Sequence, residues 1–371
     1  MNRCASLFTA FCLCTVVAFA QLPNQLLSDK ISLSELDSAR FGFSISNTNY
    51  MRNTEYFNPI EEGRTLFGYQ LHPKLSYQPT KNIKLETGIW LRHDFGGANG
   101  FTEAIPTFSL KAKGKNTELI FGTLEGALSH GILEPMMDIN SAIYKRIENG
   151  FQYKFHSKIS WLDTWINWEK FIEPKEFAKE KFTAGIHYRG RINLSESTKI
   201  TSYFQFMASH QGGQIDTDTI NPFLMQFNAA LGLKFQHNLS EKNSIYLDMA
   251  YLGYNETSDS KIYPKNAGNG VMGNLGLKLD QTDLMISYWQ GSNFIAPRGT
   301  SIYQSSSTVD PKNYEENRQL VFVRFIQNKA LFHSPVMASI RFEPVIDLKN
   351  GIFDFSYSLY LVYKGDWKFG K

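Results

Sequence analysis

Residues 351–363 read GIFDFSYSLYLVY and carry the pattern that decides the fold. Large apolar or aromatic side chains occupy every second position from Phe353 onward, whereas Asp354, Ser356 and Ser358 lie between them. A side-chain period of two predicts a β-strand with two unlike faces. Such a strand fits either a wall with lipid on one side and water on the other, or the core of a large soluble sandwich. The rest of the chain decides between these two environments.

Residues 1–20 have the parts of a cleavable secretory signal. Arg3 supplies a basic start, an apolar run follows over residues 5–19, and a site of small residues precedes Gln21. The apolar run is too short to span a bilayer as a helix. We therefore expect cleavage before Gln21, and we expect residues 21–38 to be a periplasmic lead that is either a short helix or unstructured.

The three cysteines, Cys4, Cys12 and Cys14, all lie inside this signal. The mature chain therefore has no thiol for a disulfide, a metal site or a nucleophile. Since large secreted eukaryotic proteins usually carry disulfides, their absence favours bacterial export. The formal net charge is +3, which gives no sign of a nucleic-acid partner.

Alternating segments follow one another from residue 40 to the end, without a long helical pattern or a change in composition. We therefore expect one domain over residues 39–371. The pattern predicts about sixteen strands, with roughly fourteen or eighteen as alternatives. The predicted strands cover residues 40–50, 65–78, 82–94, 105–113, 117–125, 151–157, 161–169, 182–193, 199–210, 226–237, 244–254, 271–279, 283–290, 319–327, 336–343 and 352–364.

The links between these strands alternate in length. Short links, such as residues 79–81 and 114–116, alternate with long ones, such as residues 95–104, 126–150 and 291–318. Short periplasmic turns that alternate with long extracellular loops are typical of membrane β-barrels. A soluble sandwich has no reason to alternate in this way.

Assigning faces by parity places apolar side chains on one face and charges on the other. In residues 82–94, for example, Ile89 and Leu91 would face lipid, while Lys84 and Glu86 would face the lumen. Charges are costly against lipid, so this separation is what a membrane wall demands. Together with the alternating links, it predicts an all-β fold, a transmembrane antiparallel up-and-down β-barrel.

The signal, the alternation, the loop rhythm and the aromatic last strand together resemble the porin-like outer-membrane β-barrels of Gram-negative bacteria, in a style similar to those of Bacteroidetes. The resemblance covers residues 40–371 and is architectural. It implies an outer-membrane location, contact with lipid and lipopolysaccharide, passive diffusion of small polar or anionic solutes, and the homo-trimer common among porins. Porin strands commonly finish on a terminal aromatic residue, whereas this chain continues from Tyr363 to Lys371, which leaves open the aromatic that ends the last strand.

In porins of this kind the third external loop folds into the barrel and narrows the pore, and the third long link here covers residues 126–150. A loop of this length usually has a function. The resemblance therefore implies a constriction that selects solutes by size and charge; the competing interpretation is an external lid with solvated charges. The candidate constriction residues are Glu125, Glu134, Asp138, Lys145, Arg146 and Glu148.

The wall that could face this loop follows from the same parity. Basic groups lead slightly on it, which favours anionic or neutral polar solutes. Inward tryptophans could stack on sugar rings, so a plugged barrel that binds surface polysaccharide or a protein partner is the alternative function, and ordinary packing is the competing interpretation of the tryptophans. The candidate wall residues are Lys74, Arg92, Lys111, Arg189, Arg191, Lys234, Trp90 and Trp165.

The sequence offers no motif for catalysis. Ser129 and His130 are adjacent and would point apart on a strand, and neither a Gly-x-Ser-x-Gly elbow nor a His-Glu-x-x-His motif occurs. The histidines are scattered without metal-ligand spacing. We therefore expect no enzymatic activity, no metal and no cofactor, and we rank a barrel enzyme that acts on lipid below the other two functions.

Overall fold

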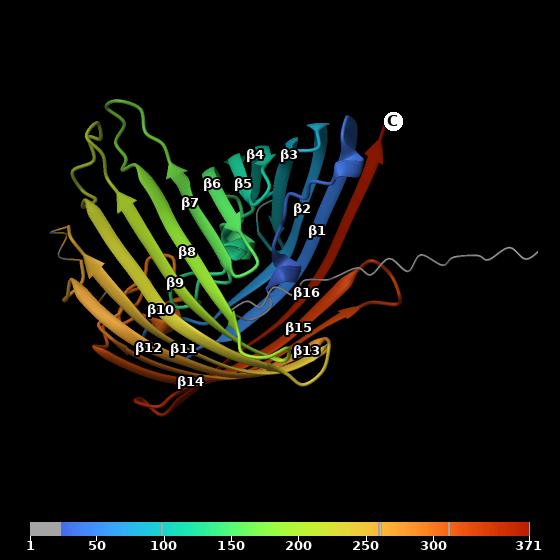
Figure 1. The fold of residues 1–371 in the computed structure, drawn as a ribbon. Coiled ribbons are helices and arrows are strands. Elements are labelled where there is room, and N and C mark those ends of the chain that lie inside the picture. Colours follow the sequence, from blue (N-terminus) through green and yellow to red (C-terminus); the bar gives the residue numbers. More distant parts are fainter. Residues whose placement is uncertain (1–23, 98, 259, 261, 311, 371) are drawn as a thin grey trace, which may run out of the picture.

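The computed structural model describes residues 24–97, 99–258, 260, 262–310 and 312–370. Within them, sixteen strands form one closed barrel in which neighbouring strands are antiparallel (Figure 1). The predicted all-β barrel is confirmed, with the predicted number of strands. The strands are β1 (Arg40–Glu55), β2 (Arg64–Thr80), β3 (Ile83–Asp94), β4 (Glu103–Lys113), β5 (Thr117–Thr123), β6 (Asn149–His156), β7 (Ser160–Lys170), β8 (Lys181–Asn193), β9 (Thr198–Gln211), β10 (Leu224–Asn238), β11 (Asn243–Glu256), β12 (Ala267–Leu279), β13 (Thr282–Ser292), β14 (Asn317–Ala330), β15 (Met337–Asp347) and β16 (Ile352–Phe369).

The first and the last strand close the barrel. Strand β1 pairs with β16 in a register that runs from Phe41 opposite Phe369 to Glu55 opposite Phe355. The segment after Tyr363, whose role the sequence left open, is therefore part of the last strand, and Phe369 ends it. A closed ring leaves no sheet edge unpaired, as the hydrocarbon of a bilayer requires.

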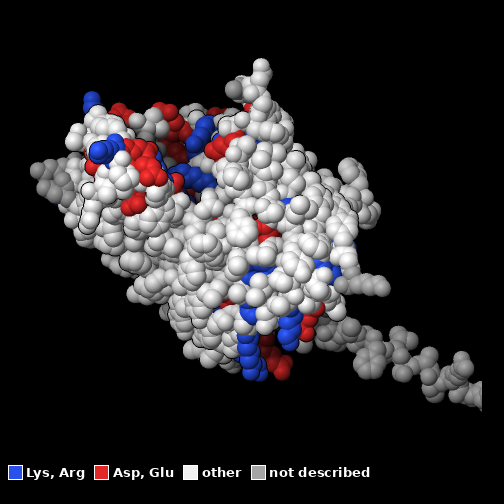
Figure 2. All heavy atoms as spheres, turned by 90° about the horizontal axis from the view of Figure 1, so that it is seen from above, with Lys and Arg blue, Asp and Glu red and all other residues white. Residues whose placement is uncertain are grey.

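Side chains alternate between the two faces of the wall as predicted. In β10, Leu231, Leu233 and Phe235 are exposed on the outer face, whereas Lys234 and Gln236 are buried on the inner face. Figure 2 shows a broad surface with few charged side chains, and charged groups that gather toward opposite ends of the molecule. An apolar outer band of this kind suits contact with the hydrocarbon core of a membrane.

The two rims of the barrel differ in the length of their links. One rim carries short turns, such as residues 81–82, 114–116 and 280–281, and the other carries long loops. In the two-residue turn between β12 and β13, Asp280 has a φ of 45°. This left-handed conformation is what tight hairpin turns require, and aspartate adopts it more readily than most residues.

Parts of three segments lie inside the ring of strands: the N-terminal segment (residues 24–38), the first inner loop (residues 124–148) and the second inner loop (residues 293–310 and 312–316). Leu133 of the first inner loop and Phe294 of the second belong to one buried apolar cluster with wall side chains. The hydrophobic core therefore lies inside the barrel, where the two inner loops meet. The short helices of these segments are η1 (Gln25–Leu27), η2 (Glu35–Asp37), η3 (Ala127–Ser129), α1 (Ser141–Tyr144) and η4 (Ser301–Tyr303).

Among the described residues, no helix has the length and the apolar character needed to cross a membrane.

Candidate functional site

A buried histidine lies in the polar part of the interior. His130 follows η3 in the first inner loop and is fully buried. Its Nδ1 is 2.9 Å from Oδ2 of Asp163 on β7, and its Nε2 is 2.9 Å from Oε2 of Glu148. A neutral imidazole has one N–H donor, whereas both nitrogens of the imidazolium donate. The two carboxylates therefore favour the charged ring, on which Trp165 stacks with a centroid distance of 3.6 Å.

Arg298 joins this histidine cluster to the second inner loop. Its Nη2 is 3.2 Å from Oε1 of Glu148, and its Nη1 is 3.0 Å from Oε1 of Glu169. On the other side, Gln152 donates from Nε2 to both carboxylate oxygens of Asp163, over 2.9 and 3.0 Å. Each buried charge thus has a charged or hydrogen-bonding partner, which is the condition for burying it.

A second cluster connects the first inner loop to β14. Nη2 of Arg324 is 2.5 Å from Oε2 of Glu134, and the hydroxyl of Tyr303 donates to the same oxygen over 3.0 Å. The Nε of Arg324 is 3.4 Å from Oε1 of Glu343. Glu134 is a candidate constriction residue, whereas Arg324, its partner on the wall, was not among the predicted residues.

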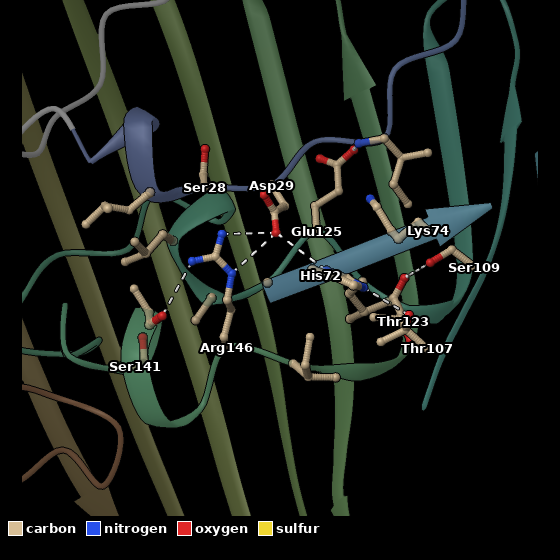
Figure 3. A pocket seen from close by; sticks show the side chains of 18 of the residues that line it. Ser28, Asp29, His72, Lys74, Thr107, Ser109, Thr123, Glu125, Ser141 and Arg146 are labelled. Atoms are coloured by element: carbon tan, nitrogen blue, oxygen red, sulfur yellow. Dashed lines mark hydrogen bonds and ion pairs between the residues drawn. The ribbon is translucent and has the colours of Figure 1, made fainter. Parts of the chain in front are cut away.

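The N-terminal segment meets both ends of the first inner loop (Figure 3). Oδ2 of Asp29 is 3.0 Å from Nη2 of Arg146, near the end of that loop. The backbone N–H of Ile31 donates to Oε1 of Glu125, near its start, over 3.0 Å. The same carboxylate oxygen accepts a hydrogen bond from Lys111 over 3.0 Å. Two candidate constriction residues therefore contact the segment that the sequence placed as a periplasmic lead.

A cavity of about 470 Å³ lies at the rim of the long loops, and we call it the vestibule. Its lining includes Glu61 and Arg64 near the start of β2, together with Asp138, Tyr144 and Lys145 of the first inner loop. The hydroxyl of Tyr144 donates to Oδ2 of Asp138 over 2.5 Å, and Nη2 of Arg64 donates to that hydroxyl over 3.3 Å. The vestibule thus brings two carboxylates, a phenol and a guanidinium to one wall.

Glu61 has the properties of a proton acceptor. It is buried, and its Oε2 has no hydrogen-bond partner among the described residues. Burial first, and the carboxylate of Asp138 second, raise the pKa of Glu61 to about 7. A carboxyl group whose pKa lies near neutrality can both accept and donate a proton at ordinary pH. Glu61 with Asp138, Tyr144 and Arg64 is therefore the candidate functional site.

The structure divides the candidate constriction residues between different places. Asp138 and Lys145 line the vestibule, whereas the other four candidates are buried in separate ion-pair clusters. Those four residues are Glu125, Glu134, Arg146 and Glu148.

The candidate wall residues are spread along the inner face, each with its own partner. Trp90 and Trp165 are buried, and His130 covers one face of the Trp165 ring. The basic candidates meet nearby groups of the chain: Lys74 with Glu86, Arg92 with Glu103, Lys111 with Glu125, Arg189 with the ring of Trp161, Arg191 with the carbonyl of Lys158, and Lys234 with the ring of Tyr246. The described wall therefore shows no single row of basic groups across from the first inner loop.

Sequence reasoning missed Glu61, Arg64 and Arg298. They lie in or beside links, where side-chain parity assigns no face. For Arg298 a signal existed, because residues 291–318 form one of the two longest links and long loops usually have a function.

Solved structures with similar folds are outer-membrane barrels. OprD of Pseudomonas aeruginosa aligns with a TM-score of 0.54 and 11% identity, over 91% of this chain and 99% of that one. A loop L8 deletion mutant of OmpT, an outer membrane protein of Vibrio cholerae, aligns with a TM-score of 0.52 and 9% identity, over 88% of this chain and 100% of that one. At these identities the likeness concerns the fold, which is that of a porin-like outer-membrane barrel. A search of curated proteins finds no match.

A family comparison bears on activity. Residues 33–371 match the family described as Lipid A 3'-O-deacylase-type. Deacylases are enzymes, so this match contradicts the expectation that the chain has no enzymatic activity. That expectation rested on contiguous motifs, whereas the polar groups of the vestibule come from separate links of the chain.

Proposed function

The chain belongs to the Lipid A 3'-O-deacylase-type family, and we propose that it hydrolyses an acyl ester of a lipid A-type glycolipid at the vestibule. The observation that carries this proposal is the buried Glu61 carboxyl group, which has an oxygen without a partner among the described residues and a pKa of about 7. The vestibule lies among the long loops, which membrane barrels turn outward. The polar part of an outer-leaflet lipid is therefore the ligand within reach.

In this mechanism Glu61 is the general base. Its ionised carboxylate accepts a proton from a water molecule, and the water oxygen attacks the carbonyl carbon of the ester. The bond between that carbon and the sugar oxygen then breaks, and protonated Glu61 returns its proton to the leaving sugar oxygen. The products are a free fatty acid and a glycolipid with a new hydroxyl group.

Other groups of the vestibule have supporting roles. Arg64 is the donor for the negative charge that develops on the carbonyl oxygen, while the hydroxyl of Tyr144 accepts from Arg64 and donates to Asp138. Lys145 is exposed on the same wall and attracts an anionic headgroup, because cationic side chains bind phosphates. The lining thus supplies a base, an oxyanion donor and a charge for the headgroup.

The test uses the mature chain refolded into vesicles that contain lipid A. Mass spectrometry of the lipid and measurement of released fatty acid follow the reaction. We expect Glu61→Gln to reduce the rate by at least about a hundredfold, the lower end of general-base effects. Glu173→Gln, in the exposed loop after β7, is the matched control and should leave the rate unchanged.

The outcomes distinguish a wrong activity from a wrong assignment of the general base. If lipid A remains intact with the unaltered protein, the proposed activity is wrong. If the unaltered protein and Glu61→Gln hydrolyse lipid A equally fast, the activity stands but the assignment of Glu61 is wrong.

We propose a second function for the same barrel, the passage of small polar or anionic solutes. The porin-like fold supports it, and so does the position of the first inner loop inside the wall, where Glu134 contacts Arg324. Single-channel conductance in a planar bilayer tests it, and Glu134→Gln should change the conductance steps. If the folded and inserted protein shows no conductance steps, the result would favour the plugged barrel that binds a surface glycan or a protein partner.

The proposal also covers removal of the signal, the extent of the barrel domain and the oligomeric state. We propose that residues 1–20 are removed on export, that residues 21–38 precede the wall, and that residues 39–371 form one barrel domain. The mass of the mature protein tests the cleavage, and chemical cross-linking in the membrane tests the homo-trimer.

A further inference from the structure

The inner wall near the short-turn rim holds the N-terminal segment as an extended peptide. Leu27 and Ile31 of this segment are buried inside the barrel. Wall side chains donate to four backbone carbonyls of the segment: Lys364 to Ser28 over 2.6 Å, Lys111 to Ile31 over 2.8 Å, Lys84 to Ser32 over 3.0 Å and Gln78 to Ser34 over 2.6 Å. These donors come from four strands, β16, β4, β3 and β2. Together they form a binding site for one extended peptide segment.

Asp29 ties the segment to the first inner loop. Its carboxylate is 3.0 Å from Nη2 of Arg146 (Figure 3). The same carboxylate is 3.7 Å from Nζ of Lys364 on the wall. Arg146 in turn donates to Oε1 of Gln70 over 3.2 Å, and Gln70 donates to the carbonyls of Ala142 and Ile143 in α1. One carboxylate therefore contacts both the wall and the part of the loop that leads to the vestibule.

The start of the loop is held in the same way. Glu125 accepts the N–H of Ile31 and pairs with Lys111 at 3.0 Å. Leu27 also lies in one buried cluster with Ala142 and Ile143 of α1. Polar and apolar contacts thus link the N-terminal segment to both ends of the first inner loop.

The segment is less firmly held than the wall around it. Strand β1 begins at Arg40 and forms backbone ladders along its length with two neighbouring strands. The described hydrogen bonds between residues 24–34 and the wall come largely from side chains of the wall. Each residue of the segment loses backbone freedom on docking, and few buried apolar side chains offset that loss. Elements of this kind open locally while the rest of the protein stays folded.

We propose that residues 24–34 are a displaceable plug, which closes the lumen from the short-turn rim and holds the first inner loop in place. When the plug withdraws, Lys84, Lys111 and Lys364 lose the carbonyl groups that they bind, and Arg146 loses Asp29. The inner wall exposed there still carries ion pairs, since Lys84 keeps Glu86 and Lys111 keeps Glu118. The plug thereby couples the periplasmic side of the barrel to the loop that lines the vestibule.

Thiol labelling tests this coupling in the full mature chain. Residues 21–371 contain no cysteine, so a single introduced thiol is the only reactive site. Leu27→Cys reports on the plug and Ile143→Cys on the first inner loop, since both side chains are buried. A water-soluble maleimide is added to each folded reporter, and the labelling rate follows the population in which that site is open.

Two perturbations act on the plug, and one control does not. Asp29→Asn removes the charge that Arg146 binds, and Ile31→Asn removes a buried apolar side chain without touching Arg146. Asp37→Asn is the control, because Asp37 lies in η2, its side chain is about as exposed as that of Asp29, and its ion pair with Lys368 spans 4.0 Å. Barrel formation is checked for every variant by its heat-dependent gel mobility.

We expect Asp29→Asn to raise the labelling rate of both reporters by roughly tenfold to a hundredfold, as the loss of a hydrogen bond between charged groups implies. Ile31→Asn should raise both labelling rates as well. Asp37→Asn should leave both labelling rates close to those measured without a perturbing substitution. If neither reporter responds, or if Leu27→Cys responds while Ile143→Cys does not, the plug does not hold the loop and the proposal is wrong. Because labelling requires neither hydrolysis nor conduction, its result is independent of the proposed function.

Discussion

Replacing His130 by alanine should destabilise the barrel strongly, because the ring is the shared cationic partner of two buried carboxylates. His130 contacts Asp163 and Glu148 at 2.9 Å each, and all three side chains are almost completely inaccessible to solvent. The substitution leaves Asp163 with Gln152, and Glu148 with Arg298. Breaking a buried ion pair from one side costs about 3–5 kcal/mol, and the remaining partners place the expected cost within that range.

Urea unfolding in lipid vesicles measures this cost. Tryptophan fluorescence follows the transition, and linear extrapolation gives the free energy of unfolding in water. His156→Ala is the control, since the His156 side chain is exposed at the end of β6 and its loss should cost less than about 0.5 kcal/mol. His130→Gln should cost less than His130→Ala, because an amide can still donate to one of the carboxylates.

The reasoning fails if His130→Ala lowers the free energy of unfolding by less than about 0.5 kcal/mol, the effect of an ordinary surface substitution. In that case Asp163 and Glu148 would be satisfied without the imidazolium. The cluster would then fill space in the interior without holding the first inner loop against β7.

Two further predictions concern the outer wall and the vestibule. Leu231→Arg, on the exposed outer face of β10, should destabilise the barrel in vesicles by about 2–4 kcal/mol, whereas Leu239→Arg in the exposed turn after β10 should have an effect near zero; equal effects in urea unfolding would argue against a lipid-facing wall. Because Glu61 must be ionised to act as a base and its pKa is raised to about 7, the rate of acyl release should rise as pH increases through about 7 and level off above it. A rate that falls over the same pH range would assign Glu61 the role of an acid.

The wall of the barrel could be predicted because a period of two is a local property. Leu231 and Leu233 are separated by one residue, and so are Lys234 and Gln236, so parity assigns each residue to a face before any contact is known. A one-residue error would place charges against lipid, and its cost fixes the register. The strand count follows from the same alternation, since each strand must reach from one rim to the other.

The interior could not be predicted in the same way. Asp29 and Arg146 are 117 positions apart, and their contact depends on the N-terminal segment and the first inner loop both entering the ring. Glu61, Asp138 and Arg298 come from three links that carry no periodic pattern. Parity assigned Lys111 to the inner face, where its side chain is buried, yet its partner Ile31 lies in the N-terminal segment, to which parity assigns no face.

This difference explains why a porin-like fold and a deacylase-type family meet in one chain. The wall satisfies its backbone hydrogen bonds by closing on itself, and this constrains the outward and inward faces but not the contents of the lumen. Two inner loops and the N-terminal segment fill that space with paired charges such as Glu134 with Arg324, which leaves the vestibule as a cavity at the loop rim. In a barrel of this kind the loops determine the chemistry, because they supply nearly every polar group of the vestibule.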